Sequence, residues 1–205
     1  AYQHQYIYRD LNIVLLDATE PFGFGYPLPR GFLRETPSNL RRADFVILTK
    51  SDMVEKKQLE QIRSKILSYT NAPQALAVHA PCHVNRLGEK ERYPLETLQN
   101  QKLLAFSGIG NPESFIQSLI KQKIRPLEQV VYSDHHQYTQ EDKEKLLSRA
   151  LNIQAQGFVT TAKDAVKIKD WQNCPIPLWI WQIEFRIVEG EEELAQKIAK
   201  IFTKF

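Results

Sequence analysis

The stretch Leu11-Asn12-Ile13-Val14-Leu15-Leu16-Asp17 is a nearly continuous apolar run that ends in an acid. Such a run predicts a strand that is buried on both faces of a parallel sheet. Residues 43–49, Ala-Asp-Phe-Val-Ile-Leu-Thr, have the same character. Between Val54 and Tyr69, apolar residues recur at helical spacing among lysines and glutamates, which predicts an amphipathic helix. This succession of strand, helix and strand indicates an α/β fold.

The rest of the chain continues the alternation, and a mostly parallel sheet with flanking helices is expected. Further strands are predicted at residues 103–107, 130–132, 158–161 and 177–187, and further helices after Asn111-Pro112, from Thr139 to Leu151 and from Glu191 to Phe205. The segment 80–101 is polar, and we expect an irregular connection between two lobes there. We therefore expect a nucleotide-binding core over residues 1–100, a smaller α/β lobe over 101–188 and a closing helix over 189–205.

The composition is that of a folded protein, with 42% hydrophobic and 25% charged residues among 205. A net charge of +3 does not indicate binding through neutralised phosphates, so no nucleic-acid partner is expected. The two cysteines, Cys82 and Cys174, form no CxxC pair and favour a reducing compartment. No run of about 18 apolar residues predicts a membrane span.

Two groups near the amino terminus carry polar side chains suited to phosphate or metal chemistry. Gln3 and His4 can donate to phosphate oxygens or position water around a metal, or they can simply lie on a polar turn. Residues 21–37 are rich in proline, glycine and aromatic residues and predict a long ordered loop beyond a parallel strand, where α/β proteins bind ligands. Near the end of this loop, Arg34 can brace phosphate oxygens and Glu35 can hold Mg²⁺; the alternative is a surface ion pair.

Two further motifs follow strands. Residues 49–52, Thr-Lys-Ser-Asp, match a base-reading motif of GTPases, although a polar turn leaving a strand is the commoner explanation for such a short match. In residues 133–138, Asp134 precedes the adjacent His135 and His136, a pattern compatible with a proton-transfer dyad, a metal site or a solvated turn. Zinc is not expected, because His79 and His83 lack ligand spacing to this pair. Lys163 and Asp164 can pair and fix a turn, which is the role we favour, or Lys163 can reach an anionic ligand.

Taken together and in this order, these blocks resemble the tetraacyldisaccharide 4'-kinase (lipid A 4'-kinase) family. The loop from Asp17 to Glu35 matches its signature D-A-x-x-P-F-G-x-G-x-L-L-P-x-G-x-L-R-E. The other matching blocks are Gln3-His4, residues 105–112 (Ala-Phe-Ser-Gly-Ile-Gly-Asn-Pro), Asp134-His135-His136 and residues 161–167 (Thr-Ala-Lys-Asp-Ala-Val-Lys). The resemblance covers nearly the whole chain.

The resemblance implies a P-loop-kinase-like fold, incomplete at the amino terminus. It also implies ATP-dependent, Mg²⁺-dependent phosphorylation of the 4'-hydroxyl of a lipid A disaccharide precursor. Gln3, His4, Arg34 and Glu35 would then contact the nucleotide, with Gln3 and Glu35 near the metal. Asp134 and His135 would be the catalytic pair, the histidine also partnering an upstream aspartate. The family implies a cytoplasmic protein, peripheral to the inner membrane and in contact with the membrane surface.

This sequence also departs from the family pattern. It contains no G-x-x-x-x-G-K-[ST], the loop whose amides and lysine cradle phosphates. We therefore expect the chain to be inactive as a kinase by itself. It would be either the product of a truncated or split gene, or half of a two-piece enzyme whose partner is a separate amino-terminal P-loop segment. Two other hypotheses remain open, a GTPase-like nucleotide-binding module that uses residues 49–52 and a non-catalytic interaction domain.

Overall fold

The computed structural model describes residues 2–4, 6–168, 171 and 174–203. These residues form two compact units. Unit 1 comprises Ala1–Ala80 with Phe185–Phe205, and unit 2 comprises Pro81–Glu184. The sequence placed the divisions at 100/101 and at 188/189 instead. The difference arises because two long strands, β3 (Gln74–Arg86) and β7 (Leu178–Glu189), each contribute residues to both units.

The strands follow the hydrogen-bonded order β1-β2-β3-β7-β6-β4-β5. In unit 1, β1 (Ile13–Asp17) pairs in parallel with β2 (Phe45–Thr49), and β2 pairs in parallel with the first part of β3. In unit 2, β7 pairs in parallel with β6 (Gly157–Thr161), β6 with β4 (Leu103–Ser107), and β4 with β5 (Glu128–Val131). The expected parallel α/β architecture is confirmed.

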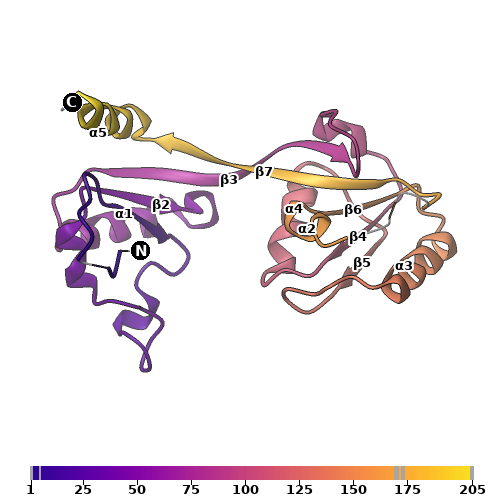
Figure 1. The fold of residues 1–205 in the computed structure, drawn as a ribbon, viewed down its shortest axis with the longest axis horizontal. Coiled ribbons are helices and arrows are strands. Elements are labelled where there is room, and N and C mark those ends of the chain that lie inside the picture. Colours follow the sequence, from indigo (N-terminus) through magenta and orange to yellow (C-terminus); the bar gives the residue numbers. More distant parts are fainter. Residues whose placement is uncertain (1, 5, 169–170, 172–173, 204–205) are drawn as a thin grey trace. The chain divides into compact units, whose positions relative to one another are not determined.

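Helices cover both faces of the strands in unit 1 (Figure 1). Side chains alternate along β2, so that Val46 and Leu48 face α1 (Lys56–Leu67), where Ile62 and Ile66 complete one core. The opposite face carries Phe45 and Ile47, which pack with Leu194 of α5 (Glu191–Phe202). Such burial on both faces explains why β2 reads as an unbroken apolar run.

Unit 2 is layered in the same way. One face of its sheet packs on α2 (Pro112–Lys121) through Phe115 and Leu119, and the other packs on α3 (Gln140–Asn152) through Leu146. Trp179 and Trp181 of β7 are both buried on the α2 face, which confirms that they pack in the core. The α2 helix begins as predicted, because the Asn111 side chain accepts from the backbone N–H of Ser114.

The expectation of an irregular connection over residues 80–101 is wrong in its first part. Residues 80–86 are the second half of β3, in which Val84 is fully buried, and Val84 bridges to Tyr93 further along. Scattered polar residues hid this strand, since its partner β7 is about a hundred residues away and local periodicity does not report such pairing.

Short helical turns occupy the remaining connections. They are η1 (Gly23–Gly25), η2 (Pro37–Arg42), η3 (Ser51–Met53), η4 (Leu95–Leu98) and α4 (Ala162–Ala165). Within the part of the chain that the structure describes, no helix has the length and apolar character needed to cross a membrane.

Candidate active site

In unit 1, the carboxyl ends of β1 and β2 bring Asp17 and Lys50 together. The Lys50 ammonium donates to Asp17 Oδ2, and Thr19 donates to Asp17 Oδ1 from its backbone N–H at 3.0 Å and from its hydroxyl at 2.6 Å. Burial by itself would raise the pKa of Asp17. The hydrogen bonds from Lys50 and Thr19 outweigh that effect, so the pKa of Asp17 is lowered.

Contacts within the chain explain the residue types at positions 49–52, without recognition of a guanine base. Lys50 adopts a left-handed conformation, with φ +55°, that turns its side chain to Asp17. The Ser51 hydroxyl donates to the backbone carbonyl of Ala77 at 3.2 Å. These intramolecular bonds fix a polar turn between β2 and η3, which is the alternative to base recognition given for this motif above.

The long loop between β1 and β2 is ordered by its own backbone. We call residues 21–35 the Gly-Pro loop. Leu28 N–H donates to Leu33 O at 2.9 Å, and Leu33 N–H donates to Tyr26 O at 3.3 Å. A Cβ on Gly31 would lie 2.2 Å from Tyr26 O and 2.6 Å from Gly23 O, so only glycine fits where the loop closes on itself.

At the end of the Gly-Pro loop, Glu35 is joined to the amino-terminal segment through Arg42. The Arg42 guanidinium donates to Glu35 Oε2 and lies over the Tyr2 ring, 4.5 Å from its centroid. The Tyr2 hydroxyl donates to Asn39 O at 2.7 Å, and burial raises its pKa. Tertiary structure thus gathers Tyr2 and Glu35, 33 positions apart in the sequence, around an arginine that the sequence did not single out.

The other predicted residues of unit 1 flank this cluster. Gln3 and His4 directly follow Tyr2 and are exposed, and Arg34 precedes Glu35 and is exposed as well. An exposed guanidinium, imidazole and amide beside a half-buried carboxylate can meet an anionic ligand from solvent. Within this predicted set, the Glu35 carboxylate is held by Arg42, and the backbone carbonyl of His4 accepts from Arg9.

In unit 2, three loops lie at the carboxyl ends of β4, β5 and β6, and Asp164 joins the loop after β4 to the turn after β6. Its carboxylate is completely buried and accepts from Gly108 N–H at 3.1 Å and from the Thr161 hydroxyl at 2.7 Å. Lys167 Nζ lies 3.7 Å from Asp164 Oδ1. Burial, and next the charge of Asp164, raise the pKa of Tyr138 far above its ordinary range. Asp164 therefore fixes the turn, as predicted. It also binds Gly108, a contact that the sequence did not indicate.

Asp134 and His135 are presented by the loop after β5. The backbone N–H of His135 donates to Gly108 O at 3.2 Å and to Asp134 Oδ1 at 2.9 Å, and His135 has φ +60°. Its Nε2 lies 3.6 Å from Asp134 Oδ2. The side chains are 88% and 53% exposed for His135 and Asp134, so both are available to a ligand. Asp134 also packs on Gly110, where an added Cβ would lie 3.2 Å from Oδ2.

His136, the next residue, is held inside the unit. Its Nε2 lies 3.0 Å from Asp142 Oδ2, and its ring stacks on Tyr132 with centroids 4.5 Å apart. Asp142 also completes the predicted capping box with Thr139 at the start of α3. Burial opposes ionisation of Asp142, but its hydrogen bonds from Thr139 and His136 outweigh that and lower its pKa. The two adjacent histidines thus have opposite environments, one exposed and one anchored.

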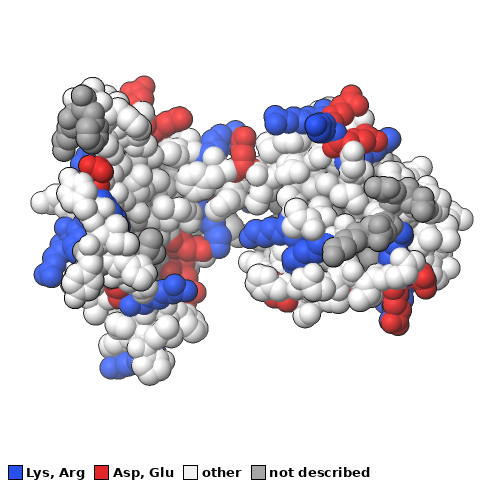
Figure 2. Space-filling view, in the orientation of Figure 1, with Lys and Arg blue, Asp and Glu red and all other residues white. Residues whose placement is uncertain are grey.

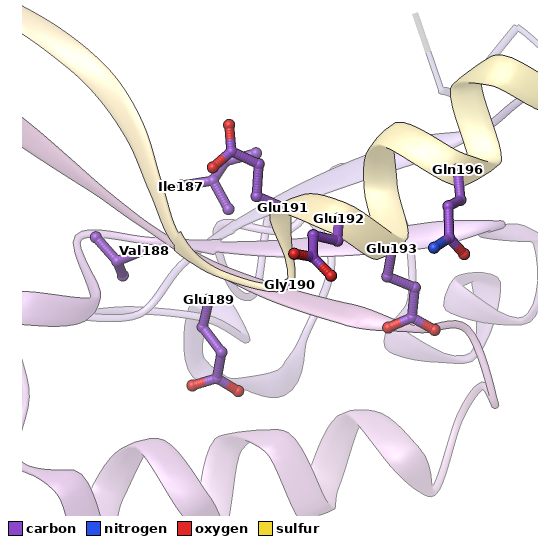
Figure 3. A pocket seen from close by; sticks show the side chains of 8 residues that line it. All are labelled: Ile187, Val188, Glu189, Gly190, Glu191, Glu192, Glu193 and Gln196. Carbon is purple, nitrogen blue, oxygen red and sulfur yellow. The ribbon is translucent and has the colours of Figure 1, made fainter.

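Unit 1 also contains a concave surface, of about 650 Å³, where β7 runs into α5 (Figure 3). Its side chains include four glutamates, whose carboxylates point in different directions in Figure 3. One of them, Glu189, accepts from Arg63 at 2.6 Å. No predicted site residue lines this surface, and its negative charge would repel a phosphate.

Among the described residues, no three or more His, Cys, Asp or Glu side chains are grouped so as to hold a metal ion. This finding leaves Mg²⁺ untested, because that ion is commonly held through one or two protein carboxylates together with substrate phosphates.

Parallel strands with polar loops beyond their carboxyl ends define the class of α/β proteins that bind ligands at that edge. The particular family follows from comparison with known proteins. Residues 1–203 match the model of the family described as Tetraacyldisaccharide-1-P 4'-kinase, and the chain belongs to this family.

Individual relatives agree with this assignment. The tetraacyldisaccharide 4'-kinase of Halothermothrix orenii is 34% identical over 97% of this chain, and that of Syntrophus aciditrophicus is 35% identical over 91%. A crystal structure of LpxK from Aquifex aeolicus in complex with ATP has a TM-score of 0.70 and 26% identity over 98% of this chain. The chain spans about half the length of these proteins, namely 56%, 52% and 55% of each.

Proposed function

We propose that this chain takes part in the transfer of the γ-phosphoryl group of ATP to the 4'-hydroxyl of a tetraacyldisaccharide 1-phosphate. Membership of the kinase family supports the reaction class. The observation that carries the proposal on this chain is the Asp134–His135 pair, which is exposed and held on a loop fixed to Gly108. A solvent-accessible imidazole beside a carboxylate is the arrangement expected of a proton-transfer group.

In the proposed reaction, the His135 ring accepts the proton of the 4'-hydroxyl as its oxygen forms a bond to the γ-phosphorus. The bond from that phosphorus to the bridging oxygen breaks, and ADP leaves with the electron pair. The Asp134 carboxylate, with Oδ2 3.6 Å from Nε2, lies beside the ring that receives the proton.

On the nucleotide side, Arg34 and His4 donate to phosphate oxygens, where charge accumulates in phosphoryl transfer. Gln3 and Glu35 offer an amide and a carboxylate oxygen, hard donors that suit Mg²⁺. When bound, Mg²⁺ neutralises charge on the β- and γ-phosphates. Arg42 holds Glu35 in place, which orients its carboxylate before any ligand arrives.

The 205 residues contain no G-x-x-x-x-G-K-[ST], so in this proposal the phosphate cradle is supplied from outside them. The proposed location is the cytoplasmic face of the inner membrane, where the lipid substrate would be presented. A nucleotide titration separates this function from the GTPase-like alternative, because guanine-selective binding would count against a kinase.

The test is a 4'-kinase assay with radiolabelled ATP, run on the chain alone and after mixing with the amino-terminal half of a family relative. We expect no turnover from the chain alone and measurable turnover from the mixture. His135→Ala should then lower kcat by about 10²–10⁴-fold. His79→Ala, which removes another exposed histidine, is the matched control and should leave kcat unchanged. Equal turnover with and without His135 would refute its proposed role.

A further inference from the structure

The Gly-Pro loop turns apolar side chains toward solvent. Phe24, Leu28 and Phe32 are 71%, 62% and 66% exposed. The rings of Phe24 and Phe32 contact each other, with centroids 5.3 Å apart. Clustered exposed apolar side chains mark interaction sites more often than singly scattered ones do.

Backbone hydrogen bonds within the loop hold these side chains in their exposed positions. Phe32 N–H donates to Gly23 O at 3.2 Å, and Gly31 N–H donates to Pro27 O at 3.0 Å, so the two sides of the loop are bonded to each other. Residues 27 and 33 also form an isolated bridge. A loop ordered in this way has already lost most of its conformational freedom, so binding a partner costs little further conformational entropy.

Positive charge predominates on the Gly-Pro loop, and its one acidic residue, Glu35 at its end, is paired with Arg42. Residues 21–34 contain Arg30 and Arg34 and no acidic residue. The Arg30 guanidinium lies over the Tyr26 ring, 3.7 Å from its centroid, beside the apolar cluster. In Figure 1 the loop projects from the strands of unit 1, and in Figure 2 the projecting tip is white with a blue side chain and no red on the visible face.

We propose that the Gly-Pro loop inserts into the interfacial layer of a lipid bilayer that carries anionic headgroups. Phenylalanine and leucine side chains partition below the headgroups, an aromatic side chain such as that of Tyr26 is favoured at the interface, and Arg30 pairs with headgroup phosphates. The choice of a bilayer rests on the proposed function, since a substrate with four acyl chains resides in a membrane.

A protein partner fits the loop less well. One projecting tip presents few side chains, whereas a stable protein–protein interface buries about 800 Å² on each partner. Interfacial insertion needs only a small apolar group backed by positive charge, because each arginine adds its own attraction to an anionic surface. The loop has both elements, and its one carboxylate, Glu35 at its end, is held by Arg42.

The test is flotation of the whole chain with vesicles of phosphatidylcholine, with and without phosphatidylglycerol. The wild-type chain should float with the anionic vesicles. Phe24→Ser with Phe32→Ser should lower the partition coefficient about tenfold or more. Arg30→Ser should lower it about fivefold on anionic vesicles and less on neutral ones. A matched control is Leu151→Ser with Val166→Ser, which removes two exposed apolar side chains from unit 2 and should float like the wild type.

Circular dichroism establishes that each variant is folded before it is compared. The proposal is overturned if the wild-type chain stays with the unbound fraction, or if the double serine variant floats as well as the wild type. It is also overturned if that variant keeps vesicle binding but no longer binds the amino-terminal half of a relative, since the loop would then be a protein contact. Flotation needs neither ATP nor turnover, so a failed kinase assay and failed vesicle binding remain separate results.

Discussion

The Nε2 atom of His136 lies 3.0 Å from Oδ2 of Asp142, whereas the ring of the preceding His135 faces solvent. One histidine therefore fixes the loop to the start of α3, and its neighbour is displayed by that loop. The two histidines differ because the left-handed conformation of His135 turns successive side chains to different surroundings.

We expect the two histidines to respond differently to alanine. His136→Ala removes the stacking on Tyr132 and the partner of Asp142, and should lower the free energy of unfolding by about 1–3 kcal/mol. His135→Ala should change it by less than about 0.5 kcal/mol, as exposed substitutions do. Urea unfolding followed by circular dichroism measures both, and equal losses would contradict the assignment.

Asp142 should make stability depend on pH in the acid range. Its pKa is lowered in the folded protein from an ordinary value of 3.8, so the folded state binds this proton more weakly than the unfolded state does. Its contribution is therefore complete above about pH 4 and is lost as the pH falls through the folded-state pKa. We expect Asp142→Asn to be less stable than wild type at pH 7 and the gap to narrow toward pH 3. A gap that widens in acid would reverse the sign and exclude this account.

Asp164 should be the most sensitive polar position in unit 2. Asp164→Ala leaves Gly108 N–H and the Thr161 hydroxyl without their acceptor inside a buried site, which should cost about 3–5 kcal/mol. Asp164→Asn keeps one acceptor oxygen and should cost less. Lys163→Ala, on the same short helix, serves as the control. Thermal unfolding ranks the three variants, and an alanine variant as stable as the control would be inconsistent with the network.

Gly31 should tolerate no side chain. An alanine Cβ would lie within 2.6 Å of two backbone carbonyl oxygens, so the Gly-Pro loop must open to admit it. Gly25→Ala is the matched control, since its Cβ would meet no atom within 4 Å and only its φ of +78° is costly, by about 1–2 kcal/mol. Limited proteolysis should cleave the loop of Gly31→Ala faster than that of Gly25→Ala, and identical cleavage rates would show that the closure is not tight.

Much of the fold was accessible from local patterns. The apolar runs at β1, β2 and β4 predicted three strands. Burial is confirmed for β2 and β4, whereas β1 is only partly buried and its Leu15 is 57% exposed, so the prediction of burial on both faces is wrong there. The cap residues Asn111 and Thr139 marked helix starts that the structure confirms. These features depend on neighbours within a few residues, so the sequence contains the information directly. The second half of β3 was missed because its partner strand lies about a hundred residues further along.

Part of the candidate site could also be predicted from local sequence patterns. Loops after parallel strands were identified by position, and the blocks around Gln3-His4, Arg34-Glu35 and Asp134-His135 carried the family resemblance. Arg42 and the bond from Asp164 to Gly108 were not singled out, because nothing local distinguishes an arginine or aspartate that has a distant partner from one that faces solvent.

The amino-acid sequence by itself determined that this protein is an α/β protein, where most of its strands and helices lie, and the family to which it belongs. Tertiary structure alone decided that His136 is paired with Asp142 while His135 is exposed to solvent. It also decided that Arg42 contacts both Glu35 and Tyr2, and that Lys50 is paired with Asp17. The physical reason is range: burial periodicity and caps act over a few residues, whereas charge pairs and ring contacts form between residues that only the folded chain brings together.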